Sequence, residues 1–326
     1  MGNIDIWLQF LEKRCIMDKL VEVKDNIVEN ISKVIIGKEK EIELLIVAFL
    51  SGGHVLLEGI PEISRTVIAK TFSKTLHLQY NRIDFTPDLL PTDITGVNYY
   101  DQVTGDFQFK EGKLFSNIVF INEINRGNPR IQSVLFEAMQ EKQITIDGLT
   151  RQFQLPFMVL ASQSKVDSFG TYPLPDAKLD RFFMRIKLDY RQKENEESRV
   201  QDNDALNNLK SVASYKEIMN HMESIKYVKI DNKTMDYLIE IVDQTRKIKD
   251  LDFRISPRGS IDLYKAARTF AAINGRKYVT PKDVKVMAPH ILNHRIIGKD
   301  IEDIEEANGF IRDRVSKIKV PEIASI

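Results

Sequence analysis

Short apolar runs alternate with helix-like stretches along the first part of the chain. Each run is four or five residues long, and those at 118–121 and 157–161 consist wholly of apolar residues. Strands of this kind, separated by helical segments, are typical of βα units that build a parallel sheet. The pattern therefore predicts an α/β core whose strands cover residues 54–57, 81–85, 118–121, 157–161 and 184–188.

Two segments within this order alternate apolar and polar residues as β-hairpins do. Residues 99–109 turn at a Thr-Gly pair, and residues 143–155 turn at an Asp-Gly pair. Asp-Gly is a strong signal for a two-residue hairpin turn. The first hairpin carries aromatic side chains that can stabilise it by pairing across its strands. These are Tyr99, Tyr100, Phe107 and Phe109.

Helical spacing of apolar residues dominates both ends of the chain. Residues 1–33 are typical of one or two amphipathic helices, and residues 192–210 are polar and charged, as in a hinge. Later helices are expected over residues 232–247, 258–274 and 281–294, the last with Thr280 as its N-cap. The predicted domains are N-terminal helices (1–33), an α/β core (34–191), a hinge (192–210) and an all-helical lid (211–326).

Composition narrows the class of protein. Of 326 residues, 43% are hydrophobic and 29% are charged, and basic and acidic residues number 47 each. Zero net charge argues against a general electrostatic hold on nucleic acid. No apolar run approaches the roughly 20 residues that a membrane span needs, and the N-terminus lacks the pattern of a signal peptide. We therefore predict a cytoplasmic protein with no membrane span and no nucleic-acid partner.

Cysteine and histidine usage gives no sign of a metal site. The single cysteine, Cys15, excludes a disulfide within the chain. The histidines lack the spacing of metal ligands relative to Cys or carboxylates, and we expect a structural role for them. Those considered are His54, His77, His290 and His294.

The segment after the first predicted strand has the frame of a phosphate-binding loop. That pattern is Gly, four residues, then Gly-Lys-Ser/Thr, placed between a strand and a helix. Here Gly59 and Thr66 keep the ends of the pattern, while Ser64 replaces the second Gly and Arg65 replaces the Lys. We expect the helix to begin near Thr66. The candidate nucleotide-binding residues of this segment are Gly59, Ile60, Pro61, Glu62, Ile63, Ser64, Arg65 and Thr66.

Each departure from the pattern weakens the expected phosphate site. Backbone N–H groups bind an anion only where the loop wraps it closely, and Ser64 carries a Cβ where Gly adopts positive φ freely. Arg65 is a wide planar fork in place of a compact ammonium. The carboxylate of Glu62 is able to take the place of the anion. Taken alone, the segment is equally compatible with a strand–turn–helix that binds no nucleotide.

A second nucleotide motif follows downstream. The apolar strand at 118–121 ends in Asn122-Glu123. Nucleotide hydrolases present an acidic pair at this place, one residue for Mg²⁺ and one to orient the attacking water. The run LPFMVLASQS then ends in small polar residues, and GTYPLPDAKLDRF holds Arg181 on an expected helix.

These segments together resemble the MoxR family of AAA+ ATPases. The resemblance runs from about residue 34 to about residue 294, and it lies in VLLEGIP, DFTPDLLPTDITG, NEINR, FEAMQE, GTYPLPDAKLDRF and SPRGSIDLYKAAR. It implies an AAA+ P-loop NTPase fold, with a parallel-sheet core and a helical lid. It also implies ATP and Mg²⁺ as cofactors, and hexameric rings of identical or paralogous subunits with nucleotide between them. Insertions such as the hairpin at 99–109 face the ring pore or a client in this family, so the resemblance adds contact with another polypeptide as a second role for its aromatic side chains.

The resemblance assigns family roles to individual positions, and several positions depart from the family pattern. The P-loop Lys falls on Arg65, the metal-coordinating Asp on Asn122 and the water-positioning polar residue on Ser164. The catalytic Glu is retained as Glu123, and the hydroxyl ligand of Mg²⁺ as Thr66.

Other family positions are kept. Arg181 matches the arginine finger and Arg258 the second sensor, while Asn125 and Arg126 match the family string. The losses therefore cluster in the groups that hold the nucleotide and metal of the same subunit. The retained arginines are, by resemblance, groups that act on the nucleotide of a neighbour.

Hydrolysis by this chain alone is expected to be very weak or absent. Asn122 offers a neutral oxygen where Mg²⁺ prefers a carboxylate. The Lys and the Asp each offset phosphate charge in the transition state, and such groups are worth roughly a hundred-fold or more in rate. An impaired subunit would join active paralogues or its own copies in a ring, or act as a scaffold that binds clients.

Other interpretations stay open at this point. Arg181 could form a surface ion pair with Asp180, Arg258 could be solvated, and Glu123 could cap the helix expected near Pro129. An ordinary ATP-driven MoxR chaperone would act on proteins with von Willebrand A domains or on metal-dependent enzymes. A nucleic-acid motor of the same superfamily is disfavoured by the zero net charge.

Overall fold

The computed structural model describes residues 19–59, 62–163, 170–188, 206–247, 251–253, 255–298 and 304–321. Within these ranges the side chains of 62–64, 251–253 and 297–298 are not described. Residues 19–32, the described part of the predicted N-terminal helices, are helical. Of the predicted hinge, only residues 206–210 fall within the described ranges, and residues 206–208 form one helical turn.

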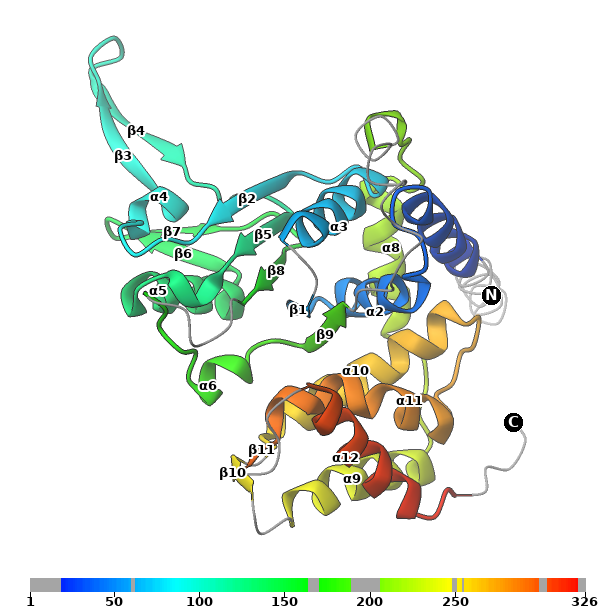
Figure 1. Ribbon diagram of the computed structural model, residues 1–326. Coiled ribbons are helices and arrows are strands. Elements are labelled where there is room, and N and C mark those ends of the chain that lie inside the picture. Colours follow the sequence, from blue (N-terminus) through cyan, green and yellow to red (C-terminus); the bar gives the residue numbers. More distant parts are fainter. Residues whose placement is uncertain are drawn as a thin grey trace, which may run out of the picture.

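A five-stranded sheet forms the centre of the core (Figure 1). Its order is β2-β5-β8-β1-β9, and every neighbouring pair is parallel. The five predicted strands are thereby confirmed. Their bounds are Val55–Gly59 (β1), Tyr80–Asp84 (β2), Ile118–Asn122 (β5), Met158–Ser162 (β8) and Met184–Leu188 (β9).

Both faces of this sheet are buried. Every residue of β5 is buried, because Val119 and Ile121 point to one face while Ile118 and Phe120 point to the other. Such double burial explains the continuous apolar runs in the sequence. One face packs on α2 (Glu39–Leu50), α3 (Glu62–Thr75) and helices of the lid, and the other on α5 (Pro129–Glu141).

Two antiparallel hairpins interrupt the βα order, as predicted. In the first, β3 (Gly96–Asp101) pairs with β4 (Asp106–Glu111) after the short helix α4 (Pro91–Thr95). In the second, β6 (Gln143–Ile146) pairs with β7 (Leu149–Gln152). The β3–β4 hairpin extends away from the core as an arm (Figure 1).

The C-terminal part of the chain is a helical lid with one short two-stranded piece. The antiparallel strands β10 (Leu251–Phe253) and β11 (Ile297–Gly298) form that piece. Asp283 accepts hydrogen bonds from the backbone N–H and hydroxyl of Thr280, which closes the N-terminus of α11 as predicted. The helices are α8 (Tyr215–Ile225), α9 (Asn232–Arg246), α10 (Pro257–Ile273), α11 (Pro281–Leu292) and α12 (Ile304–Lys317).

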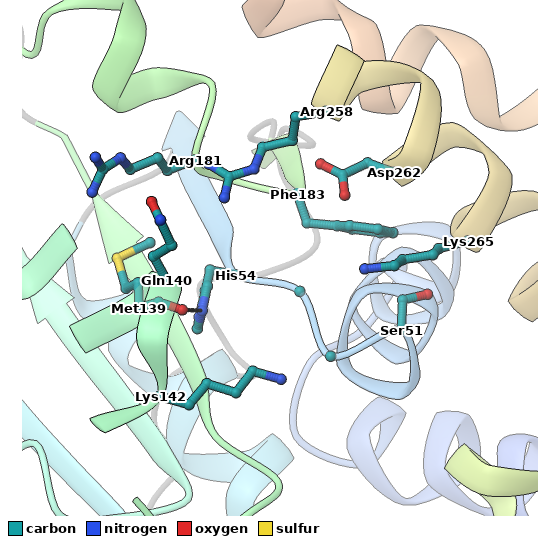
Figure 2. A pocket seen from close by; sticks show the side chains of 12 residues that line it. Ser51, His54, Met139, Gln140, Lys142, Arg181, Phe183, Arg258, Asp262 and Lys265 are labelled. Atoms are coloured by element: carbon teal, nitrogen blue, oxygen red, sulfur yellow. Dashed lines mark hydrogen bonds between the residues drawn. The ribbon is translucent and has the colours of Figure 1, made fainter. Parts of the chain in front are cut away.

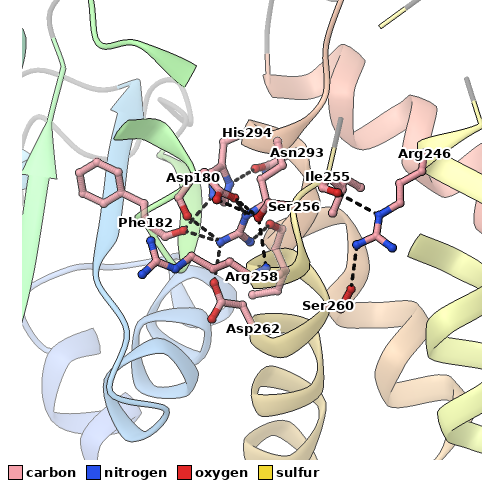
Figure 3. A network of polar contacts seen from close by, with 12 residues as sticks. Asp180, Phe182, Arg246, Ile255, Ser256, Arg258, Ser260, Asp262, Asn293 and His294 are labelled. Carbon is pink, nitrogen blue, oxygen red and sulfur yellow. Dashed lines mark hydrogen bonds and ion pairs between the residues drawn. The ribbon is translucent and has the colours of Figure 1, made fainter. Parts of the chain in front are cut away.

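A buried polar network joins the lid to the core (Figure 3). The side chain of Arg295 is 0% exposed, and its Nε donates to Asp180 at 2.8 Å while Nη2 donates to Asp262 at 2.5 Å. Ser256, the N-cap of α10, donates its hydroxyl to Asp180 at 2.8 Å. Asp180 precedes β9 in the core, so these contacts fix the start of α10 against the sheet.

Candidate nucleotide site and arginine cleft

The helix after β1 begins earlier than predicted. α3 starts at Glu62 rather than near Thr66, so its first turn includes residues 62–64 of the predicted loop. Ser64 lacks the freedom of the Gly that it replaces, and an acidic residue in the first turn favours a helix. The prediction of a loop that continues to Thr66 is therefore wrong. Ile60 and Pro61 lie outside the described residues, as does Ser164.

Gly59 has a structural reason to be glycine. Its φ is +90°, and a Cβ at this position would overlap the carbonyl oxygen of Leu188 in β9. The packing of β1 against β9 therefore requires this glycine, whether or not a phosphate is bound. Its retention is weaker support for nucleotide binding than the sequence suggested.

The two side chains that follow in the predicted loop point into the fold. Arg65 is 8% exposed, and its Nη1 donates to the backbone carbonyl of Gln163 at 3.4 Å. The hydroxyl of Thr66, the expected Mg²⁺ ligand, accepts a hydrogen bond of 3.0 Å from Nη1 of Arg82. Both groups are thus engaged with parts of the chain that come from other strands.

A chain of polar side chains crosses the carboxyl ends of three adjacent strands. Arg82 Nη2 contacts the Asp84 carboxylate at 2.6 Å, and Asn122 Nδ2 donates to the same carboxylate at 3.1 Å. Ser162 donates its hydroxyl to Asn122 Oδ1 at 3.0 Å and accepts from the backbone N–H of Glu123 at 3.0 Å. The hydrogen bonds from Arg82 lower the pKa of the Asp84 carboxyl. The sequence interpretation had assigned no role to Arg82 or Asp84.

The oxygens at this edge have the right chemistry for Mg²⁺, but a cation of the protein already contacts them. Thr66, Asp84 and Asn122 offer hydroxyl, carboxylate and amide oxygens, which are ligands of hard cations. The guanidinium of Arg82 contacts both Thr66 and Asp84. In this arrangement the residues do not fit a Mg²⁺ ion. Within the described ranges, no group of three or more His, Cys, Asp or Glu residues is placed to hold a metal.

Glu123 lies at the end of β5 in a left-handed conformation, with φ of 55°. Its carboxylate forms an ion pair with Arg126, whose Nε lies 2.8 Å from Oε2. The side chain of Asn128, and not that of Glu123, caps α5 by accepting from the N–H groups of residues 130 and 131. The helix-cap interpretation of Glu123 is therefore wrong. Asn125 is fully buried, and its carbonyl accepts from the N–H of Tyr172 at 2.6 Å.

Arg181 and Arg258 lie on the opposite edge of the sheet. Both line a cleft of about 160 Å³, whose floor is the glycine turn 51–53 before β1 (Figure 2). Arg181 lies in the turn after α6 (Asp176–Leu179), not on a helix, with its guanidinium carbon 5.9 Å from the ring centroid of Phe136. Arg258 is the second residue of α10, which agrees with the predicted helix start.

One of the two alternatives considered for these arginines is excluded. Asp180 pairs with Arg295 at 2.8 Å, so the alternative of an ion pair between Asp180 and Arg181 is wrong. Arg258 lines the cleft with a half-buried side chain. The sequence brought these two arginines together only through the family resemblance, because one comes from the core and the other from the lid.

The histidines behave as structural groups. The Nε2–H of His54 donates to the carbonyl of Met139, and its Nδ1 accepts from the N–H of Val159, each at 2.9 Å. Burial lowers the pKa of His54 to about 4. The ring of His294 contacts the carbonyl of Phe182 at 2.9 Å, and burial holds its pKa well below 6.5.

Comparison with known proteins agrees with the fold. Residues 54–184 match the ATPase family associated with various cellular activities (AAA), and residues 243–316 match the AAA lid domain. A Cytophaga hutchinsonii protein designated an ATPase has a crystal structure that superposes with a TM-score of 0.86 and 34% identity, covering 97% of this chain and 100% of that one. The chain thus has the AAA+ architecture of a parallel-sheet core followed by a lid.

Sequence relatives define the family within that class. The chain is 38% identical to the uncharacterized protein YeaC of Bacillus subtilis, over 90% of this chain and 93% of the relative. It is 34% identical to Chaperone MoxR1 of Mycobacterium tuberculosis, over 85% of this chain and 76% of the relative. The chain belongs to the MoxR family of AAA+ ATPases. A full-length MCM homolog from Methanopyrus kandleri, at 15% identity and a TM-score of 0.59, shares the fold alone.

No helix in the described part of the chain is both long and apolar enough to cross a membrane.

Proposed function

We propose that this chain is a chaperone-type MoxR subunit that hydrolyses ATP weakly or not at all at its own site, and that supplies Arg181 and Arg258 to the nucleotide of an adjacent subunit. One observation carries the proposal. Gly59 ends β1 at the carboxyl edge of the sheet, while Arg181 and Arg258 lie at the amino edge. A strand of five residues spans about 13 Å between its first and last Cα.

The separation of the two sites supports action between subunits. A phosphate chain held beside Gly59 and Thr66 lies on the far side of the sheet from the arginine cleft of the same chain. Arginines that stabilise the charge of phosphoryl transfer must contact the phosphate oxygens. A ring of this chain, or of this chain with paralogous subunits, brings the cleft of one subunit to the phosphate edge of the next.

The local structure of the phosphate edge supports weak hydrolysis. The helical start at Glu62 shortens the loop that would wrap a phosphate. Arg65 is buried toward Gln163, and Arg82 contacts the hydroxyl of Thr66. These groups would have to rearrange before Mg²⁺ and ATP took the positions that they have in active relatives.

Client remodelling is the wider role that the family suggests. Chaperone MoxR1 is a relative, and clients with von Willebrand A domains or metal-dependent enzymes are the partners that we propose for this chain. The second candidate function is an ATP-driven chaperone that hydrolyses ATP itself. Glu123 favours it, because this carboxylate stands at the end of the buried strand β5, where the catalytic Glu of the family falls.

Phosphate release distinguishes these two functions. The purified chain is incubated with ATP and Mg²⁺, alongside its Glu123→Gln variant. We expect both proteins to release phosphate at the same rate, close to the rate without protein. Steady hydrolysis by the unaltered chain that disappears in Glu123→Gln would overturn the impaired-subunit proposal in favour of the ATP-driven chaperone.

Cross-linking tests the arrangement between subunits. In a Cys15→Ser background, one preparation carries Lys70→Cys on α3 and another carries Gln140→Cys at the cleft; both residues are exposed. A short bifunctional thiol reagent should join the two preparations when they are mixed. The control replaces Gln140→Cys with Lys285→Cys, an exposed site on α11. Equal cross-linking of both pairs, or none, would contradict a neighbour that contacts the cleft.

A further inference from the structure

The arginine cleft contains two lysines that no family role explains. Lys142 follows α5, and Lys265 lies within α10. Figure 2 shows their ammonium groups pointing into the cleft from opposite walls, below Arg181 and Arg258. The ammonium groups of Lys142 and Lys265 and the guanidinium of Arg258 therefore point toward one cavity, which Arg181 also lines with its guanidinium turned toward the ring of Phe136.

The four cationic side chains outnumber the acidic side chains that line the cleft. Across the ranges that the structure describes, none of the four charged groups makes a hydrogen bond or an ion pair. Asp262 is the acidic residue among those lining the cleft, and its carboxylate accepts from Arg295 at 2.5 Å. A cleft with this balance of charge attracts an anion.

The position of Lys142 adds an independent observation. Its backbone has φ of 53°, the left-handed conformation that ends α5. This conformation is costly for a residue with a Cβ, and such strain is common at functional sites. Burial and the nearby charge of Lys265 lower the pKa of the Lys142 ammonium. The fold thus holds this lysine in the cleft against both backbone strain and charge repulsion.

We infer that Lys142 and Lys265 complete, with Arg181 and Arg258, a binding site for the phosphate chain of a nucleoside triphosphate held by a second copy of this chain. The inference rests on the proposed function and extends it to two residues. Arginine forks bind phosphate oxygens in pairs, and lysines neutralise the chain as point charges. A cavity of about 160 Å³ holds several atoms, since one water molecule occupies about 30 Å³.

The site should bind a free phosphate chain without a neighbour. Calorimetric titration of the full chain with inorganic tripolyphosphate, in buffer without Mg²⁺, measures this directly. We expect one binding event per chain, weakened roughly ten- to hundred-fold in the Lys142→Gln/Lys265→Gln variant, because each substitution removes charged hydrogen bonds. A control of equal charge change, Lys216→Gln/Lys285→Gln at exposed positions, should bind as the unaltered chain does.

A further variant distinguishes tripolyphosphate binding in the cleft from binding at the predicted P-loop. Thr66→Ala alters the predicted P-loop and should leave tripolyphosphate binding unchanged. Loss of binding in Thr66→Ala together with full binding by the double lysine variant would place the anion on the P-loop and overturn the inference. Absence of tripolyphosphate binding by the unaltered chain, with its fold verified by circular dichroism, would overturn it as well.

The source of the phosphate chain is tested with assembled subunits. The mixture cross-linked through Lys70→Cys and Gln140→Cys is titrated with ATP, with and without the two lysine substitutions in the Gln140→Cys partner. We expect the substitutions to weaken ATP binding about ten-fold. The substitutions could instead weaken tripolyphosphate binding and leave the ATP affinity of the cross-linked pair unchanged. That result would mean that the cleft binds free polyphosphate and not the nucleotide of a neighbouring subunit, and it would overturn the inference. If the subunits do not assemble, the proposed function fails, while the tripolyphosphate titration still decides whether the cleft binds an anion.

Discussion

Asn122 donates a hydrogen bond of 3.1 Å to the carboxylate of Asp84, its register partner on the adjacent strand β2. These two positions therefore hold one carboxylate and one amide at the carboxyl edge of the sheet. The family resemblance predicts the metal-coordinating Asp at position 122 of this pair. In this chain the carboxylate stands on the Asp84 side, where Arg82 neutralises it at 2.6 Å.

We predict that Asn122→Asp destabilises the protein by itself. The substitution removes the amide donor and places two carboxylates side by side, which raises the pKa of one of them. Because the side chain of Asp84 is 53% exposed, water screens the repulsion and the loss at neutral pH should be on the order of 1 kcal/mol. Urea unfolding at pH 7 and pH 5 measures it, and the loss should shrink at the lower pH as one carboxyl is protonated.

The exchanged pair is the matched control for this prediction. Asp84→Asn/Asn122→Asp again holds one carboxylate and one amide, so its free energy of unfolding should return close to that of the unaltered chain. An Asn122→Asp variant as stable as the unaltered chain, with the exchanged pair less stable, would show that the Asp84–Asn122 hydrogen bond does not govern this edge.

Arg295→Met should destabilise the joint between core and lid strongly. The guanidinium is 0% exposed and contacts Asp180 and Asp262, so its removal leaves two carboxylates without their cation. Breaking a buried pair in this way typically costs about 3–5 kcal/mol. Chemical unfolding followed by circular dichroism provides the free energy.

An exposed ion pair provides the comparison. Lys317 contacts Asp313 at 2.5 Å on α12, with side chains 66% and 58% exposed. Lys317→Met should change the free energy of unfolding by at most about 1 kcal/mol. Similar losses from the two substitutions would mean that the Arg295 network contributes no more than a surface pair.

The free energy of unfolding should decrease as the pH is lowered, over a range determined by the buried histidines. Burial lowers the pKa of His54 and of His290 to about 4, and that of His294 well below 6.5. Below pH 6.5 the unfolded chain binds protons that the folded chain excludes, so stability is lost as the pH falls from about 6.5 toward 4. Each fully shifted group contributes up to about 1.4 kcal/mol per pH unit.

His54→Gln tests this window. Urea unfolding at pH 7, 6 and 5 should show a shallower decline for this variant than for the unaltered chain. His77→Gln, at an exposed position, should keep the steep decline. Parallel curves for His54→Gln and the unaltered chain would indicate that His54 is not excluded from protonation in the folded state.

Much of the fold was accessible from the sequence because local patterns specify it. The run Ile118–Asn122 is apolar at every position but the last, which indicated a strand buried on both faces. The helical start at Glu62 was missed because the phosphate-loop pattern suggested a loop through Ser64, and only the replaced glycine argued otherwise. The predicted domain boundaries remain predictions.

The candidate site was less accessible because its contacts join distant parts of the chain. Arg82 meets Thr66 from another strand, and Asp180 takes Arg295 as its partner although Arg181 is its neighbour in sequence. Lys265 lies within a helix and Lys142 directly after one, and the sequence around neither lysine indicates that the two share a cleft. The cleft exists only because the lid folds onto the amino edge of the sheet, which no periodicity predicts.

The last prediction concerns the exposed aromatic side chains of the β3–β4 arm and their contact with other polypeptides. Tyr100 and Phe107 face each other across the hairpin with ring centroids 5.5 Å apart, yet they are 56% and 70% exposed. Cross-strand pairing explains why the two rings are in contact, but it does not explain why so much of their surface is exposed to solvent. We therefore predict that Phe107→Ala lowers affinity for an unfolded reporter polypeptide several-fold, measured by fluorescence anisotropy. The pairing term itself is about 0.5–1.5 kcal/mol, so the protein should stay folded.

Thr104→Ala, in the turn of the same hairpin, serves as the control because it leaves both rings in place. Its affinity for the reporter polypeptide should match that of the unaltered chain. The two roles of the aromatic rings, pairing across the hairpin and contact with a client, predict opposite results for Phe107→Ala. If the rings serve only to stabilise the hairpin, the variant loses thermal stability and binds the reporter normally. If they contact clients, binding falls while the unfolding midpoint moves little, because a ring that is 70% exposed contributes little to the packed core.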